Sequence, residues 1–158
     1  MDMHVGDRFG PWRPATKPLA LEAGRACHVS VFLRGRQPWL ADFHVACEVV
    51  RGFRQPQVLG DACLLAWVLM PDHVQWLIEV GDSAPLEKTV ARMKSASAVL
   101  ANRMLARAGP LWEPGYQQRL VDPLVDVRAV ARAVVAHPVR AGLVAGLGDH
   151  PFWDLAWL

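Results

Sequence analysis

Two side chains that can bind a metal stand two positions apart at the start of one apolar segment. The segment AWVLMPDHVQWLI, residues 66–78, contains His73 and Gln75 directly after the turn-forming pair Pro71-Asp72. Residues i and i+2 of a β-strand point to the same face about 7 Å apart, so both side chains could reach one metal ion. The alternative is that His73 is a hydrogen-bonded structural histidine, and the pair by itself leaves both interpretations open.

Positive charge is concentrated in one part of the chain. Residues 92–140 contain 8 basic and 3 acidic residues (net +5), residues 1–91 contain 9 and 10 (net −1), and residues 141–158 contain only two acidic residues. A basic segment on an otherwise balanced chain is typical of a surface that binds phosphates, and the alternative is a solvated helix face. The basic residues concerned are Arg92, Lys94, Arg103, Arg107, Arg119, Arg128, Arg132 and Arg140.

Two aromatic residues lie within this basic block. Trp112 and Tyr116 of the segment LWEPGY could stack on unpaired nucleic-acid bases, as aromatic side chains do in proteins that bind single strands. The alternative for both is packing, because most of the seven tryptophans in a chain of this size must serve the core. We therefore carry Trp112 and Tyr116 forward as candidates for DNA contact.

The composition predicts a single compact domain. The chain has 158 residues, of which 53% are hydrophobic and 20% charged, with a net charge of +2, so it can fill one core and is not disordered. Residues 1–25 contain prolines and glycines without periodicity and predict an extended lead-in. We expect the domain to comprise residues 26–158.

The sequence gives no signal for a membrane or for secretion. No apolar run approaches the roughly 20 residues that a spanning helix needs, and the first residues lack the apolar region of a signal peptide, so we expect a cytoplasmic protein. Cys27, Cys47 and Cys63 are widely spaced and form no C-x-x-C pair. They predict buried thiols in a reducing compartment rather than disulfides or a zinc site.

These candidate residues must be positioned by four strands and three helices. Periodicity and turn residues predict strands at 27–34, 62–70, 73–80 and 118–121, and helices at 39–51, at Ser83–Arg107, and from Asp122-Pro123 to His137-Pro138. The order β-α-β-β-α-β-α predicts an α+β protein with a ferredoxin-like split βαβ antiparallel sheet and an added C-terminal helix. The long helix and the helix at 39–51 are expected on the same face of the sheet.

Several segments in this order resemble one family. They are HVSVFLRG at 28–35, MPDHVQ at 70–75, Lys94 and Asn102 on the long helix, LWEPGY at 111–116, and HPVRAGLV at 137–144. In these segments the chain is similar to the REP-associated tyrosine transposases of the HUH superfamily, whose patterns read M-P-N-H-V-H and N-P-V-R-A-G-L-V. The resemblance extends from about Cys27 to Trp153.

The resemblance implies a fold, a partner and a reaction. It implies an HUH-type α+β domain that binds single-stranded or repeat-hairpin DNA and cleaves and transfers strands. In that family two histidines of H-x-H and a further polar residue hold a divalent metal, Mg or Mn, and a tyrosine attacks a DNA phosphate to form a covalent intermediate. Lys94, Asn102 and Arg140 occupy motif positions and are therefore preferred among the DNA-binding candidates.

This chain departs from the family pattern at three positions. Gln75 replaces the second histidine, Ala133 stands where the family has its nucleophilic tyrosine, and His137 replaces the asparagine of N-P-V. Ala133 has no nucleophilic atom, so the usual covalent step is expected to be impaired. Tyr116 is the only tyrosine in the chain, and we treat it either as a substitute nucleophile or as a structural or DNA-stacking residue.

The same departures leave the metal site and the function open. His73, Gln75 and His137 form a set of three metal-capable side chains, and the alternative is that both changes are drift in a site that has lost its metal. We predict a transposase-type DNA-binding protein with impaired strand transfer. The alternatives are an inert DNA-binding regulator or domesticated relic, and a metal-dependent nuclease in which water replaces the tyrosine. The protein is expected to be a monomer or a homodimer.

Overall fold

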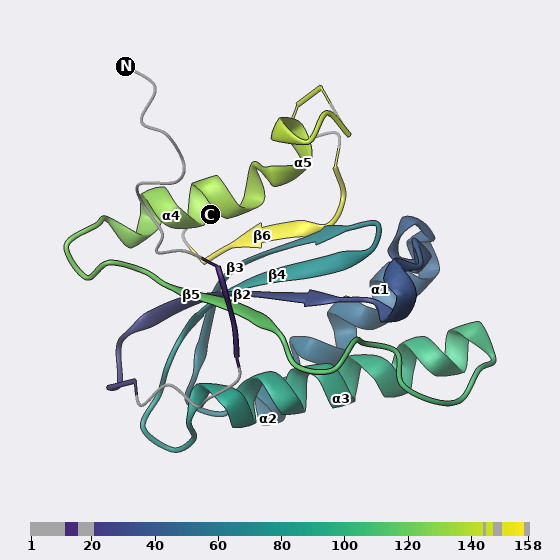
Figure 1. Ribbon diagram of the computed structural model, residues 1–158, viewed down its shortest axis with the longest axis horizontal. Helices are drawn as coiled ribbons and strands as arrows, with labels where there is room; N and C mark the ends of the chain where they lie inside the picture. Colours follow the sequence, from purple (N-terminus) through teal and green to yellow (C-terminus); the bar gives the residue numbers. More distant parts are fainter. Residues whose placement is uncertain (1–11, 16–20, 144, 147–149, 157–158) are drawn as a thin grey trace.

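A six-stranded antiparallel sheet forms the centre of the protein (Figure 1). The computed structural model describes residues 12–15, 21–143, 145–146 and 150–156. Across the sheet the strands of these segments have the order β1-β5-β2-β4-β3-β6, and every neighbouring pair is antiparallel. The strands are β1 (Arg13–Pro14), β2 (Ala26–Phe32), β3 (Cys63–Met70), β4 (His73–Glu79), β5 (Gln117–Leu120) and β6 (Trp153–Leu155).

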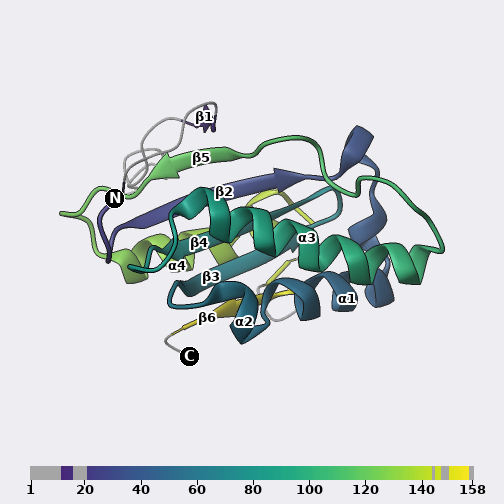
Figure 2. The same cartoon turned by 90° about the horizontal axis from the view of Figure 1, so that it is seen from below.

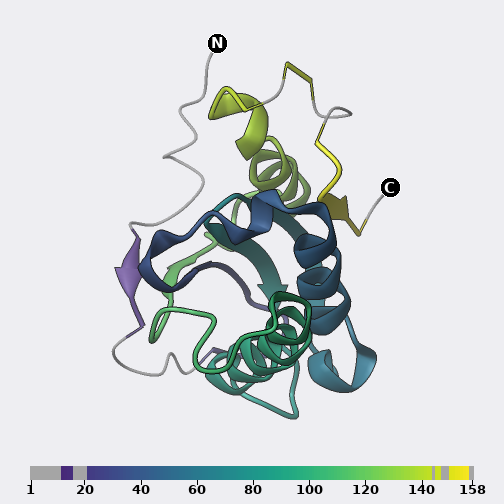
Figure 3. The same cartoon turned by 90° about the vertical axis from the view of Figure 1, so that its right-hand side faces the viewer.

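The helices are divided between the two faces of the sheet. Figures 2 and 3 show α1, α2 and α3 against one face and α4, continued by α5, on the opposite side. The helices are α1 (Phe43–Phe53), α2 (Pro56–Leu59), α3 (Leu86–Leu105), α4 (Val127–Val135) and α5 (His137–Arg140). The predicted α+β class, the split βαβ sheet and the shared face of the first and the long helix are confirmed.

Strand β4 separates the interior into two unlike regions. Val74, Trp76 and Ile78 belong to the large core beneath α1 and α3, whereas Leu77 belongs to the smaller core beneath α4. Successive side chains of a strand point to opposite faces, so His73 and Gln75 share the face of Leu77. The alternation of this one strand therefore directs its polar side chains toward α4.

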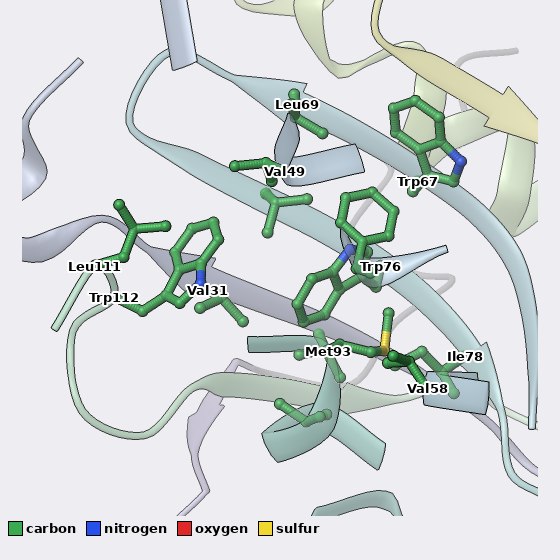
Figure 4. Packing of buried hydrophobic residues seen from close by; sticks show 14 of the residues in the cluster. Val31, Val49, Val58, Trp67, Leu69, Trp76, Ile78, Met93, Leu111 and Trp112 are labelled. Atoms are coloured by element: carbon green, nitrogen blue, oxygen red, sulfur yellow. The ribbon is translucent and has the colours of Figure 1, made fainter. Parts of the chain in front are cut away.

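The large core is built on aromatic contacts and on a close helix pair (Figure 4). The ring of Phe53 on α1 meets the rings of Trp67 and Trp76 edge to face, with centroids 5.4 and 5.3 Å apart. Gly52 lies directly against α3, because a Cβ atom added there would be 2.6 Å from the Cα atom of Ser97. The glycine thus permits α1 and α3 to pack closely.

The central strands match the sequence prediction, and the two edge strands extend it. The strands β5-β2-β4-β3 stand in the order fourth, first, third and second among themselves, which is the split βαβ arrangement. The sequence does not predict β1 or β6. Strands of two and three residues are too short to carry a period-2 pattern.

The helix ends differ from the prediction for local reasons. Helix α3 begins at Leu86 rather than Ser83, because the Ser83 hydroxyl donates a hydrogen bond of 2.6 Å to the carboxylate of Asp61, in the turn that precedes β3. The predicted helix at 39–51 is a 3₁₀ turn at Trp39–Ala41 followed by α1. Asp42 separates the two, since its carboxylate accepts hydrogen bonds from backbone N–H groups of the first turn of α1.

The structure bears on the expectations for the cysteine thiols and for membrane-spanning helices. The three thiols are free, and Cys27 is buried as predicted, whereas Cys63 is exposed. Within the described segments, no helix combines the length and the apolar character that crossing a membrane requires.

Candidate functional site

A continuous chain of hydrogen bonds runs across the face of the sheet that is covered by α4. Arg119 Nε on β5 donates to His28 Nδ1 on β2 at 3.0 Å, and His28 Nε2 lies 2.8 Å from Gln75 Oε1 on β4. Gln75 Nε2 lies 3.2 Å from His73 Nε2, and His73 Nδ1 lies 2.8 Å from Asp72 Oδ1. We call these five residues the histidine chain.

The direction of donation along the histidine chain fixes both ring tautomers. A guanidinium only donates, so Nδ1 of His28 is an acceptor and Nε2 of His28 carries the hydrogen that Gln75 Oε1 accepts. The Gln75 amide nitrogen then donates to Nε2 of His73, and Nδ1 of His73 carries the hydrogen that Asp72 accepts. Each imidazole is therefore neutral, with one nitrogen donating and one accepting.

Burial and neighbouring cations favour the neutral imidazoles. Burial, reinforced by the charge of Arg119, holds the pKa of His28 well below its usual range. Burial also lowers the pKa of His73, although the Asp72 carboxylate opposes this effect. The pKa of Arg119 itself is lowered to about 10, by burial first and by the charge of Arg140 second.

His137 joins this group from the junction of α4 and α5. Its ring lies edge-on to that of His73, with centroids 6.0 Å apart. Burial, followed by the electrostatic influence of His73, Arg140 and Arg119, lowers its pKa to about 4. The structure thus places His137 beside His73, and His73 in contact with Gln75.

Ala133 lies one helical turn before His137 on the inner side of α4. Its side chain is 7% exposed, and its backbone carbonyl accepts a hydrogen bond from the Arg140 guanidinium. A methyl group therefore occupies the position that the resemblance assigns to the nucleophile. The segment that contains Ala133 is a regular helix, and Ala133 is among its buried residues.

Aromatic rings cover both ends of the histidine chain. The Trp12 ring lies 4.7 Å from the ring of His28, and the Arg119 guanidinium lies 4.2 Å above the Trp12 ring. At the other end the Phe32 ring lies 5.0 Å from the ring of His73. Trp12 is 39% exposed, so part of this residue is open to solvent.

The sequence prediction missed His28 and Trp12. His28 and Ser30 are the polar residues that alternate with Cys27, Val29 and Val31 in β2, and this alternation is the signal that could have identified His28. No comparable signal exists for Trp12, because β1 has only two residues and its neighbourhood has no periodicity.

Of the other predicted DNA-binding residues, Arg128 and Arg132 lie on α4, and the rest lie on or beside α3, on the opposite side of the sheet. Arg92 and Arg103 are exposed on α3. Asn102 instead fixes the loop that follows α3, because its Nδ2 donates to the carbonyl of Gly109 at 2.9 Å and its Oδ1 accepts from Arg107 at 2.9 Å. The predicted set is thus divided between the two faces, with only Arg119 and Arg140 beside the histidines.

Lys94 and Trp112 hold the segment 111–116 against α3. Lys94 Nζ donates to the carbonyl oxygens of Glu113 and Gly115 at 3.0 and 2.8 Å. The Trp112 ring is 5% exposed and its Nε1 donates to Lys94 O and to Ser97 Oγ at 3.2 and 3.1 Å. The structure places Trp112 in the core rather than on a surface where a base could stack (Figure 4).

Tyr116 lies apart from the histidines. Its side chain packs against the large core and lines a groove with Glu87, Val90 and Lys94 of α3. Burial raises the pKa of the phenol to about 12. The only tyrosine is therefore on the α3 face of the sheet, and the structure does not bring it to His73 or His137.

The residues around His73 do not fit a divalent metal ion. In the part of the chain that the structure describes, no three or more His, Cys, Asp and Glu side chains are grouped to hold a metal. Both nitrogens of His73 and the amide oxygen of Gln75 are engaged in the histidine chain. Mg²⁺ and Mn²⁺ prefer carboxylate, carbonyl and water oxygens, whereas the charged neighbours of this site include Arg119 and Arg140.

Comparison with known proteins identifies the family. The family described as transposase IS200 like matches residues 27–131, about two thirds of the chain. The chain belongs to the IS200-like transposase family. The matched range ends before Ala133 and His137, so the family match covers the sheet strands β2 to β5 and helix α3 but not the segment of the missing nucleophile.

A solved structure has the same fold as this IS200-like transposase chain. It is that of a REP-associated tyrosine transposase bound to a REP hairpin, with a TM-score of 0.65, 16% sequence identity, and alignment over 88% of this chain and 81% of that one. The family resemblance predicted from the sequence is confirmed. A search of curated proteins gives no match.

Proposed function

We propose that this IS200-like transposase binds structured single-stranded DNA, such as a repeat hairpin, and that it does not form the covalent DNA intermediate of its family. The observation that carries the proposal is the position of Ala133. It is a buried residue of the intact helix α4, four positions before His137, whose ring lies beside that of His73. The helix is therefore present while the nucleophilic atom is missing.

The histidine side of the sheet supplies groups that can bind DNA. Arg119 and Arg140 both lower the pKa of His137 through their charge, so two guanidiniums lie in the neighbourhood of this ring. Guanidiniums bind phosphate oxygens in pairs of hydrogen bonds, and neutralised phosphates make binding dependent on salt. The partly exposed Trp12, which lies against Arg119, is a candidate for stacking on an unpaired base.

The site lacks the nucleophilic oxygen atom that strand cleavage requires. Strand cleavage by a tyrosine enzyme requires a phenolic oxygen to form a bond to phosphorus while a sugar oxygen leaves. Ala133 has no oxygen, and the phenol of Tyr116 lies on the other face of the sheet with a raised pKa. We therefore expect the arginines of this site to hold a phosphate without cleavage. None of the described side chains at the site is a tyrosine that could attack it.

The proposal can be tested by fluorescence anisotropy with a labelled hairpin that carries a single-stranded tail. We expect saturable binding that weakens as salt increases, and weaker binding by Arg140→Ala. Arg51→Ala is the matched control, because Arg51 is an exposed arginine on α1 that pairs with Glu48. Binding that is insensitive to salt, or equally affected by both variants, would contradict an interface on the histidine side.

A further inference from the structure

The carboxamide of Gln75 is enclosed between two imidazole rings. The residue is 5% exposed, its oxygen accepts from His28 Nε2 at 2.8 Å, and its nitrogen donates to His73 Nε2 at 3.2 Å. An amide is suited to this position because it offers an acceptor on one side and a donor on the other. A carboxylate in this position could accept from His28 but could not donate to His73.

The amide competes directly with a metal for His73. A metal bound to His73 would need a nitrogen lone pair, and the lone pair at Nε2 already accepts the hydrogen of Gln75. The other ring nitrogen, Nδ1, faces the carboxylate of Asp72 at 2.8 Å. A bound ion would therefore have to displace a buried hydrogen-bonding group on either side of the ring.

The charged groups around the histidine chain also oppose the binding of a divalent cation. Arg119 donates to the first ring of the chain, and Arg36 lies 3.6 Å from the carboxylate of Asp72. Asp72 is the carboxylate of the histidine chain, and it is already shared between His73 and Arg36. A divalent ion at His73 would add positive charge beside a carboxylate whose charge is already balanced by the Arg36 guanidinium.

We infer that Gln75 takes the place of the family's metal in this protein. Its amide joins His28 to His73 and so fixes the orientation of both rings, and through His28 it positions the Arg119 guanidinium. The site is therefore independent of divalent metal, and the single amide nitrogen of Gln75 is the group that keeps a cation from His73. This inference concerns the site alone and holds whether or not the protein binds hairpin DNA.

The test is a titration with Mn²⁺, in which the electron paramagnetic resonance signal of the ion measures binding. We expect no saturable Mn²⁺ site in the unmodified protein. Gln75→Glu has nearly the same shape, removes the donor to His73 and supplies a carboxylate ligand, so it should create a saturable Mn²⁺ site, at least about tenfold stronger than any non-saturable binding by the unmodified protein. Gln57→Glu on α2 is the matched control and should leave Mn²⁺ binding unchanged, because it adds the same charge at an exposed position.

A second measurement does not depend on any variant. Nitrogen NMR of the histidine rings in the unmodified protein should show the Nε2–H tautomer for His28 and the Nδ1–H tautomer for His73, unchanged by added Mg²⁺. A stoichiometric Mn²⁺ site in the unmodified protein that is lost in His73→Ala would overturn the inference. So would a shift of the His73 signals on addition of Mg²⁺, or a well-folded Gln75→Glu variant that binds Mn²⁺ no better than the unmodified protein.

Discussion

The two faces of the sheet use the same strands for different purposes. On the α1 and α3 face, Trp76 of β4 is fully buried and packs against Phe53. On the α4 face, the adjacent residue Gln75 is equally inaccessible but belongs to a polar chain with two imidazoles. The comparison shows that burial alone does not distinguish a core position from a site position, whereas the hydrogen-bond partners do.

Removal of the largest ring from the α1 and α3 face should have the largest effect. Trp76→Ala leaves a cavity between Phe53 and β4, and we expect the free energy of unfolding to fall by about 3–5 kcal/mol. His73→Ala on the opposite face of the same strand should lower it by about 2 kcal/mol, because two hydrogen bonds, to Asp72 and to Gln75, are lost. Urea unfolding of both variants measures the difference, and equal losses would contradict the division into core and site.

Lys94 tests whether the α3 face contributes stability or DNA contact. Lys94→Met keeps the length of the side chain but removes two charge-assisted hydrogen bonds to the carbonyls of Glu113 and Gly115. We expect the free energy of unfolding to fall by about 1.5–3 kcal/mol while the salt dependence of hairpin binding is unchanged. A stable variant with a smaller salt slope would instead show that Lys94 contacts a phosphate.

Substitution of one arginine on each face of the sheet tests directly which face binds DNA. Arg119→Gln on the histidine side should lower the slope of log affinity against log salt by about 1, because one phosphate contact is lost. Arg103→Gln on α3 carries the same change of charge at an exposed position and should leave the slope unaltered. Anisotropy titrations at several salt concentrations measure both slopes, and a larger change for Arg103→Gln would place the DNA on the α3 face.

The titration of Tyr116 should give the smallest effect, at high pH. Burial raises the pKa of Tyr116 from 10.0 to about 12, so the folded protein favours the neutral phenol. The corresponding stability is fully present below pH 10 and is lost as the pH rises through about 12. Because the chain has one tyrosine, the ultraviolet absorbance of tyrosinate reports this group alone. Ionisation of the native protein near pH 10 would show that the phenol is accessible.

The sequence predicted the fold better than the site, and particular residues show why. The alternation of β4 and the continuous apolar run of β3 are local patterns, so the central strands and their order followed from them. The grouping of His73, Gln75 and His137 followed from the family resemblance. His28 was missed because its partners, Gln75 and Arg119, are 47 and 91 positions away in the chain.

The division of the basic block between two faces was also beyond the sequence. Lys94 and Arg119 are equivalent in a charge count, but Lys94 holds the segment after α3 and only Arg119 reaches the histidines. Such a division depends on where β5 joins the sheet beside β2, which is a tertiary feature. Charge patterning therefore indicated a phosphate-binding protein without indicating which face binds.

The most direct test of the account is a search for a covalent protein–DNA adduct on a denaturing gel. The unmodified protein is incubated with a hairpin substrate in the presence of Mg²⁺ or Mn²⁺, alongside Tyr116→Phe. We predict that the hairpin is bound and that no adduct forms with either protein, because Ala133 lacks a nucleophilic atom and Tyr116 lies on the opposite face of the sheet. An adduct that forms with the unmodified protein and disappears in Tyr116→Phe would contradict the account.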